Sequence, residues 1–79
     1  MLDDYRKLPK LQGLSTPMSA AVYDAVRNGH HIHHYRSRTA AALIKRGYFY
    51  QDNGISHYSY PTDKAKKAVE AVRKEGGGQ

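Results

Sequence analysis

Hydrophobic residues recur at helical spacing in the stretch TPMSAAVYDAVRNG. They follow the i, i+3, i+4, i+7 rule of a helix with one buried side (Met18, Ala21, Val22, Ala25 and Val26). Thr16 can accept a hydrogen bond as the N-cap, and Pro17 fits the first helical position because its missing N–H has no partner there. Gly29 fits a left-handed C-terminal cap. The pattern predicts a helix over residues 17–28.

The stretch RSRTAAALIKRG has a second helical pattern. Its expected buried stripe consists of three residues (Ala40, Leu43 and Ile44). Ser37 or Thr39 can cap its start, and Gly47 can end it. We therefore expect a helix over residues 38–46, with its basic residues on the opposite side from the stripe.

A third helix is predicted close to the C-terminal end. Pro61 stops the preceding segment, and Thr62 with Asp63 can begin a helix. Its apolar stripe again has helical spacing (Ala65, Ala68, Val69 and Val72). The glycines of residues 76–79 end this pattern and predict a flexible tail.

Two segments between these helices have the character of strands. HHIHHY is too short for a helix, and its β-branched centre favours an extended segment with Ile32 and His34 turned inward. YFYQDNGISHYSY predicts a β-hairpin over residues 48–60, because Asn53-Gly54 is a strong signal for a type I′ turn. Counting outward from that turn pairs Phe49 with Tyr58.

This pairing makes a further prediction about the hairpin. It places three aromatic side chains on one face, suited to covering a small core (Phe49, Tyr58 and Tyr60). The expected fold is thus a single α+β domain with the order α-β-α-β-β-α over residues 15–75. Residues 1–14 form an arm whose leucines pack back on the core or serve a partner (Leu8, Leu11 and Leu14).

The charge of the chain narrows the function. There are 13 Lys and Arg residues against seven Asp and Glu residues, a formal charge of +6. Between Arg27 and Gln51 there are five basic residues and no acid (Arg27, Arg36, Arg38, Lys45 and Arg46). Such a concentration attracts phosphates. The alternative to phosphate binding is that these residues form a solvated basic face with no partner.

The sequence gives little support to an enzymatic, metal-binding or membrane function. There is no cysteine, no phosphate-binding glycine loop and no paired acids, so we expect neither an enzyme nor a cofactor. His30, His31, His33 and His34 could share a strand face in pairs, but no cysteine or acid completes a metal site beside them. More plausible roles for them are strand packing or phosphate contact, with DNA affinity rising at low pH. No apolar run suits a membrane span, and we expect a cytoplasmic protein.

The pattern AALIKRGYFY followed by YSYPTDKAKKAVEAV resembles the winged-helix branch of the helix-turn-helix proteins. Many winged-helix regulators have a helix ending in leucine and RG or KG, an apolar strand, a wing, and a threonine opening a closing helix. Leu43, Arg46, Gly47, the turn at 53–54 and Thr62 match these features. The resemblance implies a minimal winged helix, such as a small phage or prokaryotic regulator or an excisionase-like factor. The space between Gly29 and Ser37 is too short for the usual extra helix, so either HHIHHY replaces it as a strand or the arm supplies a third helix.

The resemblance implies that helix 38–46 is a recognition helix in the major groove of double-stranded DNA. Base contacts are expected from one set of residues (Arg38, Thr39, Ala42, Lys45 and Arg46) and phosphate contacts from another (Arg36 and Ser37). In the wing, Gln51 and Asn53 would meet the sugar–phosphate backbone. A homodimer or a cooperative array on DNA would add specificity, with the arm leucines as the contact.

Two other functions remain open from the sequence. Winged domains also bind proteins, and a basic one could bind an acidic partner surface. Exposed tyrosines beside basic residues can instead stack the bases of RNA or single strands, which predicts sensitivity at Tyr48 and Tyr50. Because the chain has one Phe and no Trp, its seven tyrosines must also serve the core.

Overall fold

The computed structural model describes residues 8–51 and 57–72. Within these ranges six elements follow one another: α1 (Thr16–Asn28), β1 (His31–Ile32), α2 (Arg38–Lys45), β2 (Phe49–Tyr50), β3 (Tyr58–Pro61) and α3 (Asp63–Val72). The α+β class and the order of elements predicted from the sequence are confirmed. HHIHHY does contain a strand, and residues 8–14 contain no helix. The predicted Asn53-Gly54 turn and the tail 76–79 lie outside the described residues.

Local capping interactions determine where α1 begins and ends. Ser15, not Thr16, is the N-cap, and its hydroxyl oxygen accepts a hydrogen bond from the Met18 N–H at 3.3 Å. The helix therefore starts one residue earlier than predicted. At the other end, Gly29 has a φ of 86° and donates its N–H to the Ala25 carbonyl at 2.8 Å, as predicted for a left-handed cap.

The start of α3 is attached to the end of α2. Ser37 caps α2 by accepting the Ala40 N–H. After α2, the Gly47 carbonyl accepts the Thr62 hydroxyl at 2.6 Å. The Lys64 ammonium donates to the Arg46 carbonyl at 2.9 Å. The carbonyl groups of the two residues that follow α2 thus accept hydrogen bonds from side chains of the segment that begins α3.

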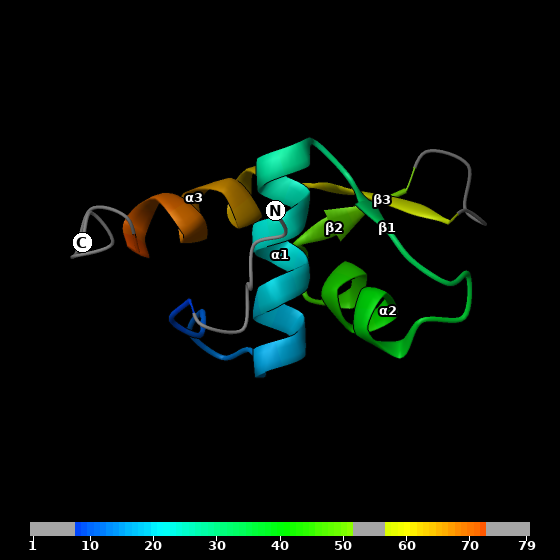
Figure 1. The fold of residues 1–79 in the computed structure, drawn as a ribbon, viewed down its shortest axis with the longest axis horizontal. Coiled ribbons are helices and arrows are strands. Elements are labelled where there is room, and N and C mark those ends of the chain that lie inside the picture. Colours follow the sequence, from blue (N-terminus) through cyan, green and yellow to red (C-terminus); the bar gives the residue numbers. More distant parts are fainter. Residues whose placement is uncertain (1–7, 52–56, 73–79) are drawn as a thin grey trace.

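Three antiparallel strands form a sheet in the order β1-β3-β2, with β3 in the centre. Helix α1 lies in the middle of the molecule, between α3 on one side and α2 with the sheet on the other (Figure 1). The sheet has an inner side toward the core, and Phe49, Ser59 and Pro61 are buried there. Its outer side carries Tyr58 and Tyr60.

The predicted register of the hairpin is wrong. Phe49 pairs with Pro61 rather than with Tyr58, a shift of three residues. Because side chains alternate along a strand, an odd shift moves a whole set of side chains to the other face. The small side chains of Ser59 and Pro61 lie beside Phe49 under the helices, where two more tyrosine rings would need additional space and would remove their hydroxyls from water.

The predicted orientation of HHIHHY is also wrong. Ile32 is 61% exposed and His34 is exposed, whereas His31 and His33 face inward. Both inner imidazoles have polar partners: His31 Nδ1 lies 2.8 Å from an Asp24 carboxylate oxygen, and His33 Nε2 lies 2.7 Å from the Ser59 hydroxyl oxygen. These hydrogen bonds compensate the imidazoles for partial burial.

The core collects apolar side chains from the arm, from the three helices and from residues 48–49. Helix α1 contributes several of these core residues, and Phe49 and Leu43 are among the most completely buried. The stripes of α1 and α3 point inward as predicted, but Ile44 of α2 is 37% exposed. Leu11 and Leu14 of the arm belong to the core, so neither is available for the predicted contact between copies. Leu8 remains 43% exposed.

Two hydrogen bonds attach the arm to α1. The Leu11 N–H donates to the Ser19 hydroxyl oxygen at 2.9 Å in a buried position. The Tyr23 hydroxyl donates to the Pro9 carbonyl at 2.7 Å. Together with the buried leucines, these bonds make residues 9–14 part of the packed unit.

Replacing Ser19 by alanine should lower the free energy of unfolding by about 1–3 kcal/mol, because the buried Leu11 N–H loses its acceptor. Urea denaturation would show this as a lower midpoint with an unchanged slope. Gln12→Ala, at an exposed position of the same arm, is the control and should have little effect. Equal midpoints for Ser19→Ala and the unmodified chain would mean that the arm does not depend on this bond.

Alkaline pH should release the Tyr23 anchor. Desolvation by burial raises the pKa of Tyr23 above its ordinary value of 10.0. The folded chain therefore holds this proton more tightly than the unfolded chain, so the stabilisation is complete below about pH 10 and is lost as pH rises through the raised pKa. Thermal melts from about pH 8 to pH 11 should show a steeper loss for the unmodified chain than for Tyr23→Phe. Parallel losses would contradict this role.

Candidate functional site

The exposed side of α2 carries basic side chains at its two ends and alanines between them. Arg38, Ala41 and Lys45 are exposed, and Ala42 is half-buried. Their spacing of three and four residues places them on one strip along the helix. The opposite side of α2 packs into the molecule through Ala40 and Leu43. The exposed side is called the outer strip of α2 below, and it consists of four residues (Arg38, Ala41, Ala42 and Lys45).

Further cations extend the outer strip at its C-terminal end. Arg46 follows α2 and is exposed. Lys64 reaches this end from α3, bonded to the Arg46 carbonyl, with its Nζ 4.7 Å from the centre of the Tyr48 ring. Sequence reasoning did not select Lys64, because its position depends on how α3 begins against Gly47. From residue 27 to residue 51 the chain has no acid to offset these charges.

At the N-terminal end of α2, the preceding loop forms a cluster of rings beside a cation. The Tyr35 ring is 51% exposed and stacks on the His34 ring at 4.8 Å. The Arg36 guanidinium carbon lies 5.2 Å from the centre of the Tyr35 ring, and the His57 ring meets its edge at 5.9 Å. Tyr35 was not selected from the sequence either, because no local pattern distinguished it from the other tyrosines. This cluster extends the basic surface beyond the helix.

Two of the other residues predicted to contact DNA, Ser37 and Gln51, have hydrogen-bond partners within the protein. Ser37 uses its hydroxyl oxygen to cap α2 but keeps a hydroxyl hydrogen to donate. Thr39 is half-buried at the edge of the outer strip. The Gln51 amide donates to the Tyr58 carbonyl at 3.4 Å and lies 3.5 Å from the Ser59 hydroxyl, so it lies against the sheet. Asn53 lies outside the described residues.

The two inner histidines, His31 and His33, stack on each other, and each is hydrogen-bonded to other residues. Their ring centres lie 5.7 Å apart. His33 Nδ1 lies 2.7 Å from the His34 carbonyl, which can only accept, so this nitrogen donates and Nε2 of the neutral ring accepts from Ser59. Within the described ranges, no three His, Cys, Asp or Glu side chains are placed to hold a metal ion.

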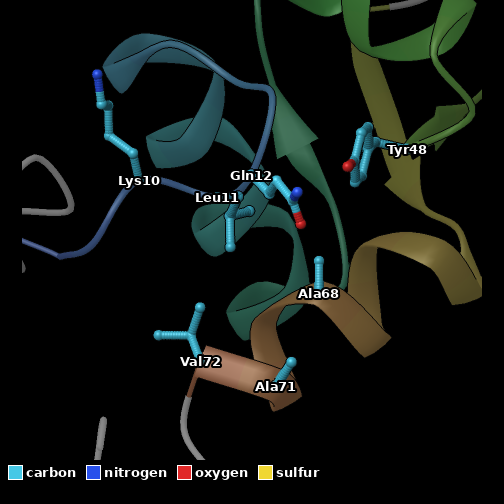
Figure 2. A pocket seen from close by; sticks show the side chains of 7 residues that line it. All are labelled: Lys10, Leu11, Gln12, Tyr48, Ala68, Ala71 and Val72. Carbon is cyan, nitrogen blue, oxygen red and sulfur yellow. The ribbon is translucent and has the colours of Figure 1, made fainter. Parts of the chain in front are cut away.

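Two hollows lie near these elements. One, of about 500 Å³, lies between the arm and α3: Leu11 and Gln12 face Ala68 and Val72 across it, with Tyr48 at one end (Figure 2). The other, of about 370 Å³, lies between α1 and the start of α2 and includes the Asp24–His31 pair on its wall. The first has one charged side chain in its lining, Lys10, and the second is open and shallow. In the second hollow His31 is bonded to Asp24, and the Ser37 hydroxyl oxygen accepts the Ala40 N–H.

Comparison of the chain with family models, with curated proteins and with solved structures found no match. None of the helices in the described residues is long and apolar enough to cross a membrane.

Proposed function

We propose that this chain is a small DNA-binding protein of minimal winged-helix type, in which α2 enters the major groove of a duplex. The outer strip of α2 is the observation that carries the proposal. A solvated surface helix would gain from glutamates beside its lysines and arginines, but α2 has none. Alanines at its centre let the backbone approach a surface closely, and the cations at its ends flank that approach.

The dimensions of α2 suit the groove. An α-helix with its side chains is about 10–12 Å across, and the major groove of B-DNA is about 12 Å wide, so the groove admits one helix. In this arrangement Arg38 reads base edges from the N-terminal end, where an arginine can bond guanine O6 and N7. The alanines contact thymine methyl groups. Arg36, Arg46 and Lys64 bind phosphates on either side and fix the register of the helix.

The β2–β3 hairpin would be the wing, beside α2. A single module of this size has limited specificity, so binding as a dimer or in an array on repeated sites fits the role of a regulator or of an architectural recombination factor. Of the three arm leucines that the structure describes, Leu8 alone is exposed enough to take part in such a contact. The origin in a phage or mobile element rests on size and fold analogy alone.

A salt titration tests the proposal. Affinity for a labelled duplex of about 30 base pairs should fall with salt at a slope of about −3 to −5 in log–log form, since four or five cations would each release about 0.9 counterion. Fluorescence anisotropy would measure it, with Lys67→Ala on the exposed side of α3 as a control that keeps the slope. Absence of duplex binding at low salt would contradict the proposal, and capture of an acidic protein instead would favour the interaction-module alternative.

A further inference from the structure

The outer side of the sheet is a surface of aromatic side chains that the duplex site does not use. Tyr58 and Tyr60 lie on the central strand β3 at positions that share one face. Tyr50 of β2 pairs with Tyr60, and Ile32 of β1 pairs with Tyr58. Tyr50 is 48% exposed and Tyr58 is 45% exposed, so about half of each residue is open to solvent. We call these four residues the outer sheet face.

Contacts among the rings hold this face in a defined arrangement. The centres of the Tyr50 and Tyr60 rings lie 5.5 Å apart with their planes tilted by 35°. The His30 ring meets the edge of the Tyr58 ring at 5.6 Å. Because each ring is restrained by a neighbour and by the strand beneath it, a flat ligand that stacks on them would cost little additional side-chain entropy.

Charge favours a polyanion as the occupant. None of the described strand residues is acidic. The acids in the described ranges are all on helices (Asp24, Asp63 and Glu70), and Asp24 is directed to the inner side by its bond to His31. The whole chain has a formal charge of +6, so two copies facing one another would repel. A ligand with both negative charge and planar apolar faces meets these conditions.

We propose that the outer sheet face stacks the bases of single-stranded nucleic acid. Alternate residues of a strand are about 6.6–6.8 Å apart, which gives Tyr58 and Tyr60 room for separate bases. Stacking on aromatic rings tolerates any base, since every base has a π-face, and the positive field of the chain holds the phosphates. The outer strip of α2 lies elsewhere: Leu43 of α2 packs in the same core as Phe49, which places α2 on the inner side of the sheet. The two surfaces are therefore separate.

The test measures fluorescence anisotropy of labelled oligothymidylate and oligouridylate of about 12 nucleotides. Tyr50→Ala and Tyr58→Ala should each raise the dissociation constant by roughly 5- to 150-fold, the range of one lost stacking contact. Tyr50→Phe and Tyr58→Phe keep the ring and should remain close to the unmodified chain. The Lys45→Ala variant should weaken duplex binding while leaving the effect of the tyrosine changes on single strands intact. The Lys45→Ala variant therefore distinguishes failure of the single-strand proposal from failure of the duplex proposal.

Circular dichroism of each variant would establish that it is folded. Absence of single-strand binding at low salt would overturn the proposal, as would alanine variants that bind as well as the unmodified chain. A dimer seen by sedimentation equilibrium and dispersed by Tyr58→Ala, with unchanged affinity for the oligonucleotide, would also overturn it and assign the face to a second copy.

Discussion

Exchanging Arg38 and Lys45 for glutamate together should weaken duplex binding about a hundredfold or more at physiological salt. Each cation of the outer strip that meets a phosphate releases about 0.9 counterion, and that release supplies much of the binding energy. Replacement by glutamate removes the base contact of Arg38 and the positive charge of Lys45, and it also places two anions in a groove bordered by phosphates. Both side chains are exposed, so the fold should be little affected.

The control for this experiment keeps the change in net charge the same. Lys66 and Lys67 lie exposed on α3, and the double exchange Lys66→Glu with Lys67→Glu alters the formal charge by an equal amount. Anisotropy titrations with one duplex would compare the two variants. If both weaken binding equally, the effect comes from total charge and α2 has no special role.

Truncating Phe49 to alanine should cost about 3–5 kcal/mol of folding free energy. Its side chain is 2% exposed and lies on the inner side of the sheet in the central cluster with Leu43. Domains of this size have total stabilities of about 5–15 kcal/mol, so the variant should approach the limit of stability. At about 4–8 °C per kcal/mol, the melting temperature should drop by roughly 12–40 °C.

Tyr58→Ala is the informative comparison for Phe49→Ala. In the register of the structure Tyr58 faces outward and pairs with Ile32, so its loss should cost no more than about 1 kcal/mol. In the register counted from Asn53-Gly54, Tyr58 would lie beside Phe49 in the core. Thermal melts that show equally large losses for the two variants would contradict the register described here.

The helices were predictable because their signals are local. Gly29 and Gly47 have φ values of 86° and 85°, as expected for glycines that end helices. The apolar stripes then indicated which side of α1 and α3 would be buried. Ile44 fits the same periodic pattern in α2, yet it lies beyond the area that the rest of the core can cover.

The sheet was less predictable because its register depends on residues far apart in the chain. Asn53-Gly54 is a strong local turn signal, but the pairing of Phe49 with Pro61 depends on what α1 and α3 can cover. His31 faces inward because Asp24 of α1 offers it a carboxylate. No periodicity in HHIHHY reveals that partner. The candidate site was partly predictable. The cations of α2 could be selected from the sequence, but the position of Lys64 beside them depends on long-range packing.

The central place of β3 has a consequence for synthesis on the ribosome. Both of its neighbours, β1 and β2, precede it in the chain and pair with it rather than with each other. The hydrogen bond between His33 and Ser59 spans 26 residues. A nascent chain that has released α1, β1, α2 and β2 therefore still lacks the strand that joins them. It presents Phe49 and two unpaired strand edges to solvent or to a chaperone. Folding of this sheet is completed only after Pro61 has emerged from the exit tunnel.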